Sequence, residues 1–124
     1  MKVKCINIYN KFTDKFQNSS NILTIGREYI VLNVEISSGT GTINYRVETD
    51  LPSKMPALCS ASQFEIVSNK ICSIWRIHQY PSGSIRLCPE SWTAPEFWEN
   101  CYNRDPQALA IFRREKAIIF DEEK

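Results

Sequence analysis

The chain has 124 residues, and its 15 Lys and Arg residues against 14 Asp and Glu residues give a formal net charge of +1. Hydrophobic residues make up 43% and charged residues 23% of the chain, which is ordinary globular usage and excludes long disorder, collagen and a coiled coil. We expect one domain over residues 1–124. No apolar run reaches the roughly 20 residues of a membrane span, and the first residues lack a secretory apolar stretch, so we expect no membrane contact and a cytoplasmic location.

The first 90 residues have the pattern of short β-strands separated by turns. Glycine and proline predict turns at residues 37–41 and 80–83, and two prolines predict a bend at 51–56. A polar stretch predicts a loop at 14–21. Strands are predicted at residues 3–8, 27–36, 43–47, 57–59, 64–67, 71–78 and 84–88. Because no helix separates them, the pattern favours a small β-barrel over residues 1–90.

The run at 27–36 is the clearest of these strands. The period-two rule places Ile30, Leu32, Val34 and Ile36 on one face, which predicts a strand with a single core face. The turn that follows it predicts a hairpin with the run at 43–47.

After Pro89 the pattern changes to that of helices, so residues 91–124 are predicted as a helical segment packed on the barrel. Thr93 and Glu96 have the spacing of a capping box, which predicts a helix start there. Asp105 followed by Pro106 predicts a second helix start. Periodicity does not decide whether residues 118–120 end that helix or form a closing strand. The predicted fold class is therefore α+β, mainly β with one or two short C-terminal α-helices.

Few residues have the pattern of a catalytic or metal site. The chain has one histidine, His78, and no pair of its five cysteines is spaced as Cys-x-x-Cys. We expect reduced structural cysteines and a half-buried strand histidine in place of a thiol nucleophile or a zinc site. Nucleotide-binding and hydrolase signature motifs are absent, so the sequence predicts neither an enzyme nor a cofactor, a bound metal or a small-molecule substrate.

Charge is divided unevenly along the chain. Residues 1–89 carry ten basic and six acidic side chains, whereas residues 90–124 carry five basic and eight acidic ones. The two regions therefore have net charges of +4 and −3. Either the acidic residues are a solvated helix face, or they form a surface for a basic partner.

Two kinds of binding module fit these charges. A basic group with interleaved aromatics is typical of a small barrel that binds RNA or the ribosome, and here it comprises Lys2, Lys4, Lys11, Lys15, Phe12 and Phe16. The sequence pI of about 7.6 is well below that of dedicated nucleic-acid binders, so this is the second choice. A protein-binding surface is the other possibility, with aromatics rimmed by acids at Glu90, Trp92, Glu96, Phe97, Trp98, Glu99 and Tyr102. Within that set, Phe97 and Trp98 are expected to pack the helix onto the barrel.

Two groups of residues resemble known families. Leu23, Gly26, Tyr29 and Val31, with the runs at 45–47, 56–58 and 60–67, resemble the strand order of an SH3-like barrel. The run Pro-Glu-Ser-Trp-Thr-Ala-Pro-Glu-Phe-Trp-Glu at 89–99, with Trp75 before it and Asp-Pro at 105–106 after it, is similar to small bacterial immunity proteins of contact-dependent inhibition and related polymorphic toxin systems. Together the two resemblances cover about residues 22–112.

This resemblance implies a cytoplasmic inhibitor, without enzymatic activity, that binds one cognate toxin domain. Such toxins are commonly nucleases, and nucleases are basic because they grip phosphate. An acidic patch that replaces phosphate would then give fast, salt-sensitive association. The residues we expect to bind the toxin are one apolar anchor and a set of acids: Trp92, with Glu90, Glu96, Glu99, Asp105, Asp121, Glu122 and Glu123.

Overall fold

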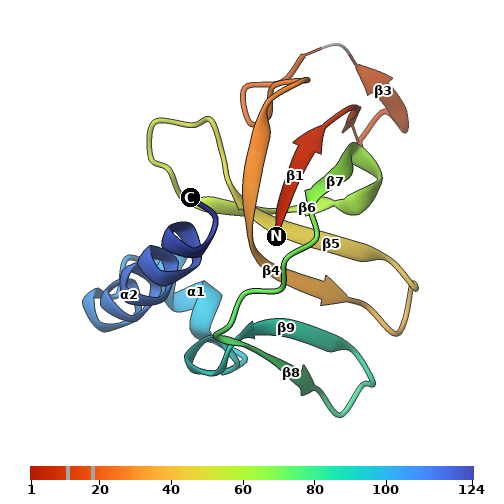
Figure 1. Cartoon of the computed structure of the whole chain (residues 1–124). Helices are drawn as coiled ribbons and strands as arrows, with labels where there is room; N and C mark the ends of the chain where they lie inside the picture. The colour runs from red at the N-terminus through yellow and green to blue at the C-terminus, as the bar shows by residue number, and fades with distance from the viewer. Residues whose placement is uncertain (11, 18) are drawn as a thin grey trace.

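A computed structural model describes residues 1–10, 12–17 and 19–124 as an antiparallel β-sheet followed by C-terminal helices (Figure 1). This confirms the predicted class, mainly β and then α. The strands are β1 (Lys2–Cys5), β2 (Ile8–Asn10), β3 (Lys15–Gln17), β4 (Glu28–Ile36), β5 (Ile43–Glu48), β6 (Pro56–Ser60), β7 (Phe64–Ser68), β8 (Trp75–Gln79) and β9 (Ile85–Pro89). Two 3-10 turns and two helices complete the fold: η1 (Ala61–Gln63), η2 (Glu90–Trp92), α1 (Phe97–Tyr102) and α2 (Pro106–Glu122).

Strand β4 organises the main sheet. Its first part pairs with β1, its last part pairs with β9, and β5 runs along its other side past a register shift between Val31 and Asn33. The strand order is β6-β5-β4-β1-β7, with β9 and then β8 branching from β4, and β2 pairs with β3 in a separate hairpin. Among the described strands, β6, β7 and β8 each have one side without a partner, so these pairings form no closed ring.

The prediction that β4 has a single core face is wrong. Tyr29, Val31, Leu32, Asn33 and Val34 are buried, so five of the six positions from 29 to 34 lie out of solvent, and they belong to both faces of the strand. The physical reason is that β4 is central in the sheet and that α2 also packs against it. A strand covered on both faces shows no clean alternation.

Both predicted hairpin turns are confirmed, and they contact each other. The loop after β4 and the loop between β8 and β9 meet where the Ser38 hydroxyl donates to the Ser82 carbonyl at 2.8 Å and the Ser38 amide donates to Ser84 Oγ at 3.1 Å. Gly83 has a φ of +92°, a conformation that residues with a side chain rarely adopt, so glycine suits this turn. The contact fixes the two hairpins side by side.

Two segments near the N-terminus differ from prediction. The expected strand at 3–8 is divided into β1 and β2, and the expected polar loop contains β3, which pairs with β2. An edge-on contact between the Tyr9 and Phe16 rings, with centroids 5.5 Å apart, supports this small hairpin. Of the predicted loop residues, Asn18 lies outside the described part, as does Lys11 of the basic group.

The C-terminal segment begins differently from the prediction but continues as predicted. The Thr93 hydroxyl donates to the Glu90 carbonyl at 2.7 Å and closes η2, so Thr93 caps no helix, and α1 starts only at Phe97. Asp105 does cap α2, because its carboxylate accepts from the Ala108 amide at 2.9 Å and Pro106 fills the first turn. The helix then runs 17 residues, which assigns residues 118–120 to a helix longer than expected.

A buried aromatic cluster joins η2, α1 and α2 to one another, and its Trp98 contacts Arg46 of the sheet. Trp92, Phe97, Trp98 and Phe112 are all buried, and their ring centroids lie between 5.1 Å and 6.0 Å apart. Phe97 and Trp98 are thus buried, as expected for packing residues, and Trp98 also contacts the sheet through Arg46 of β5. All five cysteines are buried and free, as expected for structural thiols. Within the described residues, no helix is long and apolar enough to cross a membrane.

Candidate partner-binding site

Three acidic side chains stand out on the segment from η2 to α1. Glu90, Glu96 and Glu99 are exposed, and their carboxylates have no hydrogen bond or ion pair with any other described residue. Glu99 also lies in the first turn of α1, where the helix dipole favours a negative charge. We call these three residues the acidic face.

The buried aromatic cluster packs under the backbone of η2 and α1, which carries the acidic face. Trp92 is 0% exposed, with its ring 5.3 Å from Trp98 and 5.6 Å from Phe112 between centroids. The prediction that Trp92 is an exposed anchor is therefore wrong, because a large apolar ring at the junction of η2, α1 and α2 is buried by all three. Its role is to fix the backbone that carries the carboxylates.

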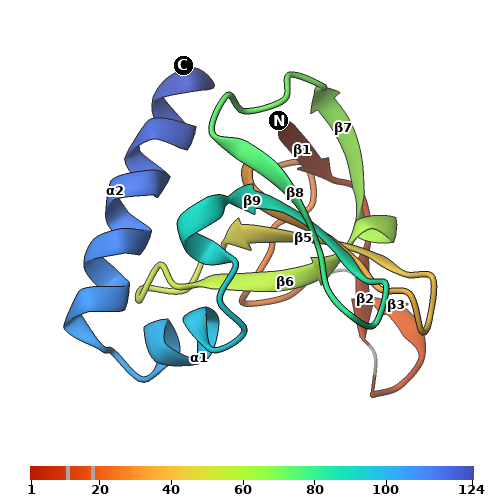
Figure 2. The ribbon, with the colours of Figure 1, turned by 90° about the horizontal axis from the view of Figure 1, so that it is seen from below.

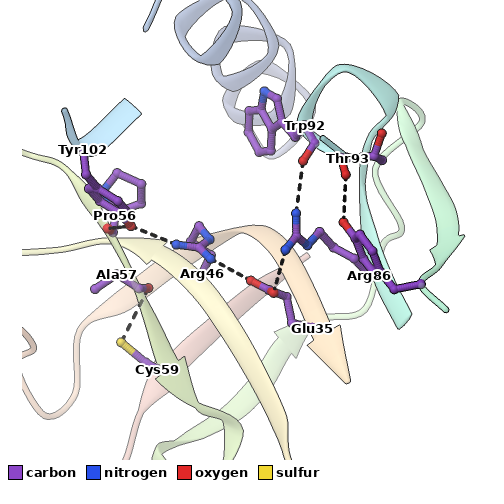
Figure 3. A network of polar contacts seen from close by, with 10 residues as sticks. Glu35, Arg46, Pro56, Ala57, Cys59, Arg86, Trp92, Thr93 and Tyr102 are labelled. Atoms are coloured by element: carbon purple, nitrogen blue, oxygen red, sulfur yellow. Dashed lines mark hydrogen bonds and ion pairs between the residues drawn. The ribbon is translucent and has the colours of Figure 1, made fainter. Parts of the chain in front are cut away.

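A buried polar network ties the same segment to the sheet (Figure 3). The Glu35 carboxylate accepts from Arg46 at 2.7 Å and from Arg86 at 3.1 Å, one oxygen for each guanidinium. Arg46 also donates to the Tyr102 hydroxyl at 2.8 Å, and Arg86 donates to the Trp92 carbonyl at 3.1 Å. Strands β4, β5 and β9 thus hold η2 and α1 through charged hydrogen bonds.

Aromatic rings complete this network. The Arg46 guanidinium lies 4.1 Å from the centroid of the Trp98 ring, and the Tyr102 hydroxyl donates to the Pro56 carbonyl at 2.6 Å. Burial raises the pKa of Tyr102, although the neighbouring Arg46 opposes this shift. The tyrosine therefore remains a neutral hydrogen-bonding group that links α1 to β6.

The thiols near this network are not activated nucleophiles. Burial raises the pKa of Cys88 to about 11, and burial likewise raises that of Cys59 to about 11. Both thiols are protonated near neutral pH, whereas the thiolate is the reactive form. His78 is half-buried on β8 with its ring 4.5 Å from that of Tyr80. Across the described chain, no three His, Cys, Asp or Glu residues gather as metal ligands.

The remaining predicted acidic residues lie apart from the acidic face or are engaged within the chain. Asp105 caps α2, Asp121 is exposed beside Lys124 at 3.6 Å, Glu122 accepts from the Ser73 amide at 2.9 Å, and Glu123 pairs with the N-terminal ammonium at 2.5 Å. A helix of this length is about 25 Å long, so the last three lie far from α1, at the other end of α2 (Figure 2). The structure therefore places Asp105 at the start of α2, three residues after the end of α1, and residues 121–123 at the other end of that helix.

The basic N-terminal group is divided as well. Lys2 and Lys4 are half-buried on β1, and Lys15 is exposed on β3 in the separate hairpin. Lys4 stands in register with Glu28 on one side and with Glu65 on the other. Acidic neighbours at paired positions weaken any attraction of this lysine for phosphate.

Sequence reasoning missed the network around Glu35. A signal was present, because the predicted hairpin pairs Asn33 with Arg46 and so sets Glu35 diagonally across from that arginine on the same face. Arg86 joins only through the pairing of β4 with β9, which joins segments about 50 residues apart. No sequence spacing indicates that contact.

The fold and the site define a small α+β protein that carries a rigidly mounted acidic surface. No protein-family model, no curated protein and no solved structure matches this chain.

Proposed function

We propose that this protein is an immunity protein that binds a cognate toxin domain and neutralises it by protein–protein contact. The observation that carries the proposal is the acidic face: three unpaired carboxylates on a segment fixed by a buried aromatic cluster and by the Glu35 network. The resemblance of residues 89–99 to bacterial immunity proteins supports the same function.

Electrostatics explains how such a face would act. A nuclease presents a basic surface to the phosphate backbone, and carboxylates held in fixed positions attract that surface from a distance. Because the segment is held in place before binding, little conformational entropy is lost on association. Glu90, Glu96 and Glu99 would make the first contacts, and Asp105 at the start of α2 would add a further negative charge.

We also propose that the strands belong to an SH3-like barrel and that the protein acts in the cytoplasm. Strand β4 supports the first point, since its register shift lets one strand serve two parts of the sheet, with β1 beside its start and β9 beside its end. Bulged strands make the corners of small barrels in this way.

The proposal is tested by co-expressing the chain with a candidate toxin domain, sought first in the gene immediately upstream of its own. We expect growth to be restored and a stoichiometric complex to elute as one species in gel filtration. The Glu96→Lys/Glu99→Lys variant should protect less well at equal expression. A toxin domain that forms no complex would contradict the proposal. Recovery of RNA that is lost at higher salt and with Lys4→Glu would favour the RNA-associated alternative.

A further inference from the structure

Asn33 is a polar side chain buried in the middle of strand β4. It is 0% exposed, and among the described residues neither the nitrogen nor the oxygen of its amide has a hydrogen-bond partner. Such an amide can donate two hydrogen bonds and accept two. Leaving it unpaired costs free energy, and buried polar groups in folded proteins are nearly always bonded to protein or to ordered water. Asn33 therefore calls for a partner that both donates and accepts.

The pairing of the strands shows what the Asn33 side chain faces. Asn33 lies directly opposite Arg46 of β5, and residues paired in this way share one face of the sheet with their Cβ atoms about 5 Å apart. On that face Arg46 contacts Trp98 and Tyr102 of α1. It also bonds to Glu35, two residues after Asn33 in β4 (Figure 3). The Asn33 amide therefore lies beside the Arg46 side chain, in the layer between the sheet and α1.

Two further polar groups in this layer are buried and unpaired. The terminal nitrogens of Arg46 bond to Glu35 and Tyr102, but its Nε has no partner among the described residues. The same holds for the indole nitrogen of Trp98, whose ring centroid is 4.1 Å from the guanidinium carbon of Arg46. Each of these nitrogens carries one hydrogen to donate. Asn33, Arg46 and Trp98 are thus neighbours that together have an excess of N–H donors and one unpaired acceptor, the amide oxygen of Asn33.

Water is the ligand that fits this set of groups. An anion could accept from the N–H groups, but it has no hydrogen to donate to the Asn33 oxygen, and a cation would be repelled by Arg46. Either ion would also lose its hydration beside a side chain that is 0% exposed, which costs far more than the transfer of a neutral molecule. A water molecule both accepts and donates, and internal waters typically make about three hydrogen bonds to polar groups that are otherwise unpaired.

We propose that the layer between the sheet and α1 binds an internal water molecule, which accepts a hydrogen bond from Arg46 Nε and donates one to Asn33 Oδ1. The water completes the bonding of Arg46, whose other nitrogens bond to Glu35 and Tyr102, so it extends the Glu35 network into the interior. The inference goes beyond the proposed function, because it concerns the interior of the protein and holds whichever partner the acidic face binds.

Cross-relaxation between water and protein hydrogens tests the site in the isotope-labelled wild-type chain, without any substitution. We expect the Nε hydrogen of Arg46 and the side-chain amide hydrogens of Asn33 to show dipolar contacts with water, with the sign that marks a bound molecule and not one at the surface. Absence of these contacts would overturn the proposal, and this result does not depend on whether a variant folds.

Oxygen-17 relaxation dispersion then counts the long-lived internal waters in two variants whose folding is checked by circular dichroism. Asn33→Leu keeps the size of the side chain and removes both polar atoms, so we expect it to hold about one internal water fewer than wild type. Asn44→Leu is the matched control, because Asn44 lies two residues from Arg46 on the same face of β5 but is only half-buried. Its count should equal that of wild type.

Two results with these variants would overturn the proposal. One is an equal count of internal waters in Asn33→Leu and wild type. The other is a broadening of the chloride resonance by the wild-type chain that Asn33→Leu abolishes and Asn44→Leu keeps, because an anion would then occupy the site in place of water.

Discussion

Glu35 is one carboxylate shared by two guanidiniums in the partly buried layer between sheet and helices. Its side chain is 21% exposed, those of Arg46 and Arg86 are 7% and 13% exposed, and each arginine takes a different oxygen. The two cations repel each other, so the carboxylate between them keeps both in place. Loss of one member of a buried ion network is costly because it leaves uncompensated buried charge.

Glu35→Gln should therefore lower the free energy of unfolding by about 3 kcal/mol, since the neutral amide leaves two cations facing each other. Urea denaturation followed by circular dichroism measures the change. Glu28→Gln, at an exposed position of the same strand, is the control and should stay within about 0.5 kcal/mol of wild type. Equal stability of the two variants would show that the network contributes nothing to folding.

At the scale of elements, helix α2 is fastened at both ends. Asp105 caps its first turn, and its last residues reach the strands, where Glu122 accepts from Ser73 and Glu123 pairs with the ammonium of Met1. Burial by itself would raise the pKa of Glu123, but the hydrogen bond and charge of the N-terminal ammonium outweigh it and hold this pKa below the ordinary value. Hydrogen bonds from Ser73 lower the pKa of Glu122.

These shifts predict acid sensitivity. A carboxylate with a lowered pKa in the folded state contributes stability above its ordinary pKa, here 4.5, and loses it as pH falls through the folded value. Glu123→Gln should cost about 2 kcal/mol at pH 7, the contribution of a charged hydrogen bond, and much less once the medium is acidic enough to protonate the wild-type carboxylate. Thermal melts between pH 7 and pH 3 compare the stability of Glu123→Gln with that of the wild type. Glu65→Gln is the exposed control, and a pH-independent cost for Glu123→Gln would contradict the account.

Elements were predictable where a local rule decides them. The hairpin turns and the start of α2 follow from glycine, proline and capping chemistry within a few residues. The start of α1 could not be predicted in this way. The Thr93 hydroxyl can donate to the Glu90 carbonyl, as it does here, or accept from a helix amide that follows it. The burial of β4 depends on its central place in the sheet and on its contact with α2, far along the chain, and no window around β4 contains that information.

In the candidate site, too, the features that depend on local sequence were predictable and those that depend on distant segments were not. Sequence identified the acidic residues as exposed candidates, and Glu90, Glu96 and Glu99 are exposed. It misplaced Trp92, because a tryptophan flanked by acidic residues gives the same local sequence pattern whether its ring binds a partner or is buried in the core. It also missed the cavity of about 910 Å³ between the β2–β3 hairpin and β6, because its lining combines residues up to about 55 positions apart.

Over the whole molecule, the acidic residues of the C-terminal region divide between the acidic face and the far end of α2. The acidic face lies on the segment from η2 to α1, and the strands carry the excess of basic residues. An approaching basic protein meets fixed carboxylates first, and salt screens their attraction beyond about 10 Å at 0.1 M ionic strength. The central claim is that this face steers a basic toxin domain.

The most direct test compares two variants with the same substitution and the same change of charge, Glu99→Lys on the acidic face and Glu65→Lys on the exposed side of β7. Stopped-flow association with the toxin domain that the co-expression test identifies is measured over a range of salt concentrations. At low salt we predict roughly tenfold slower association for Glu99→Lys, a much smaller change for Glu65→Lys, and a difference that disappears at high salt. Equal rates for the two variants at low salt would contradict the claim.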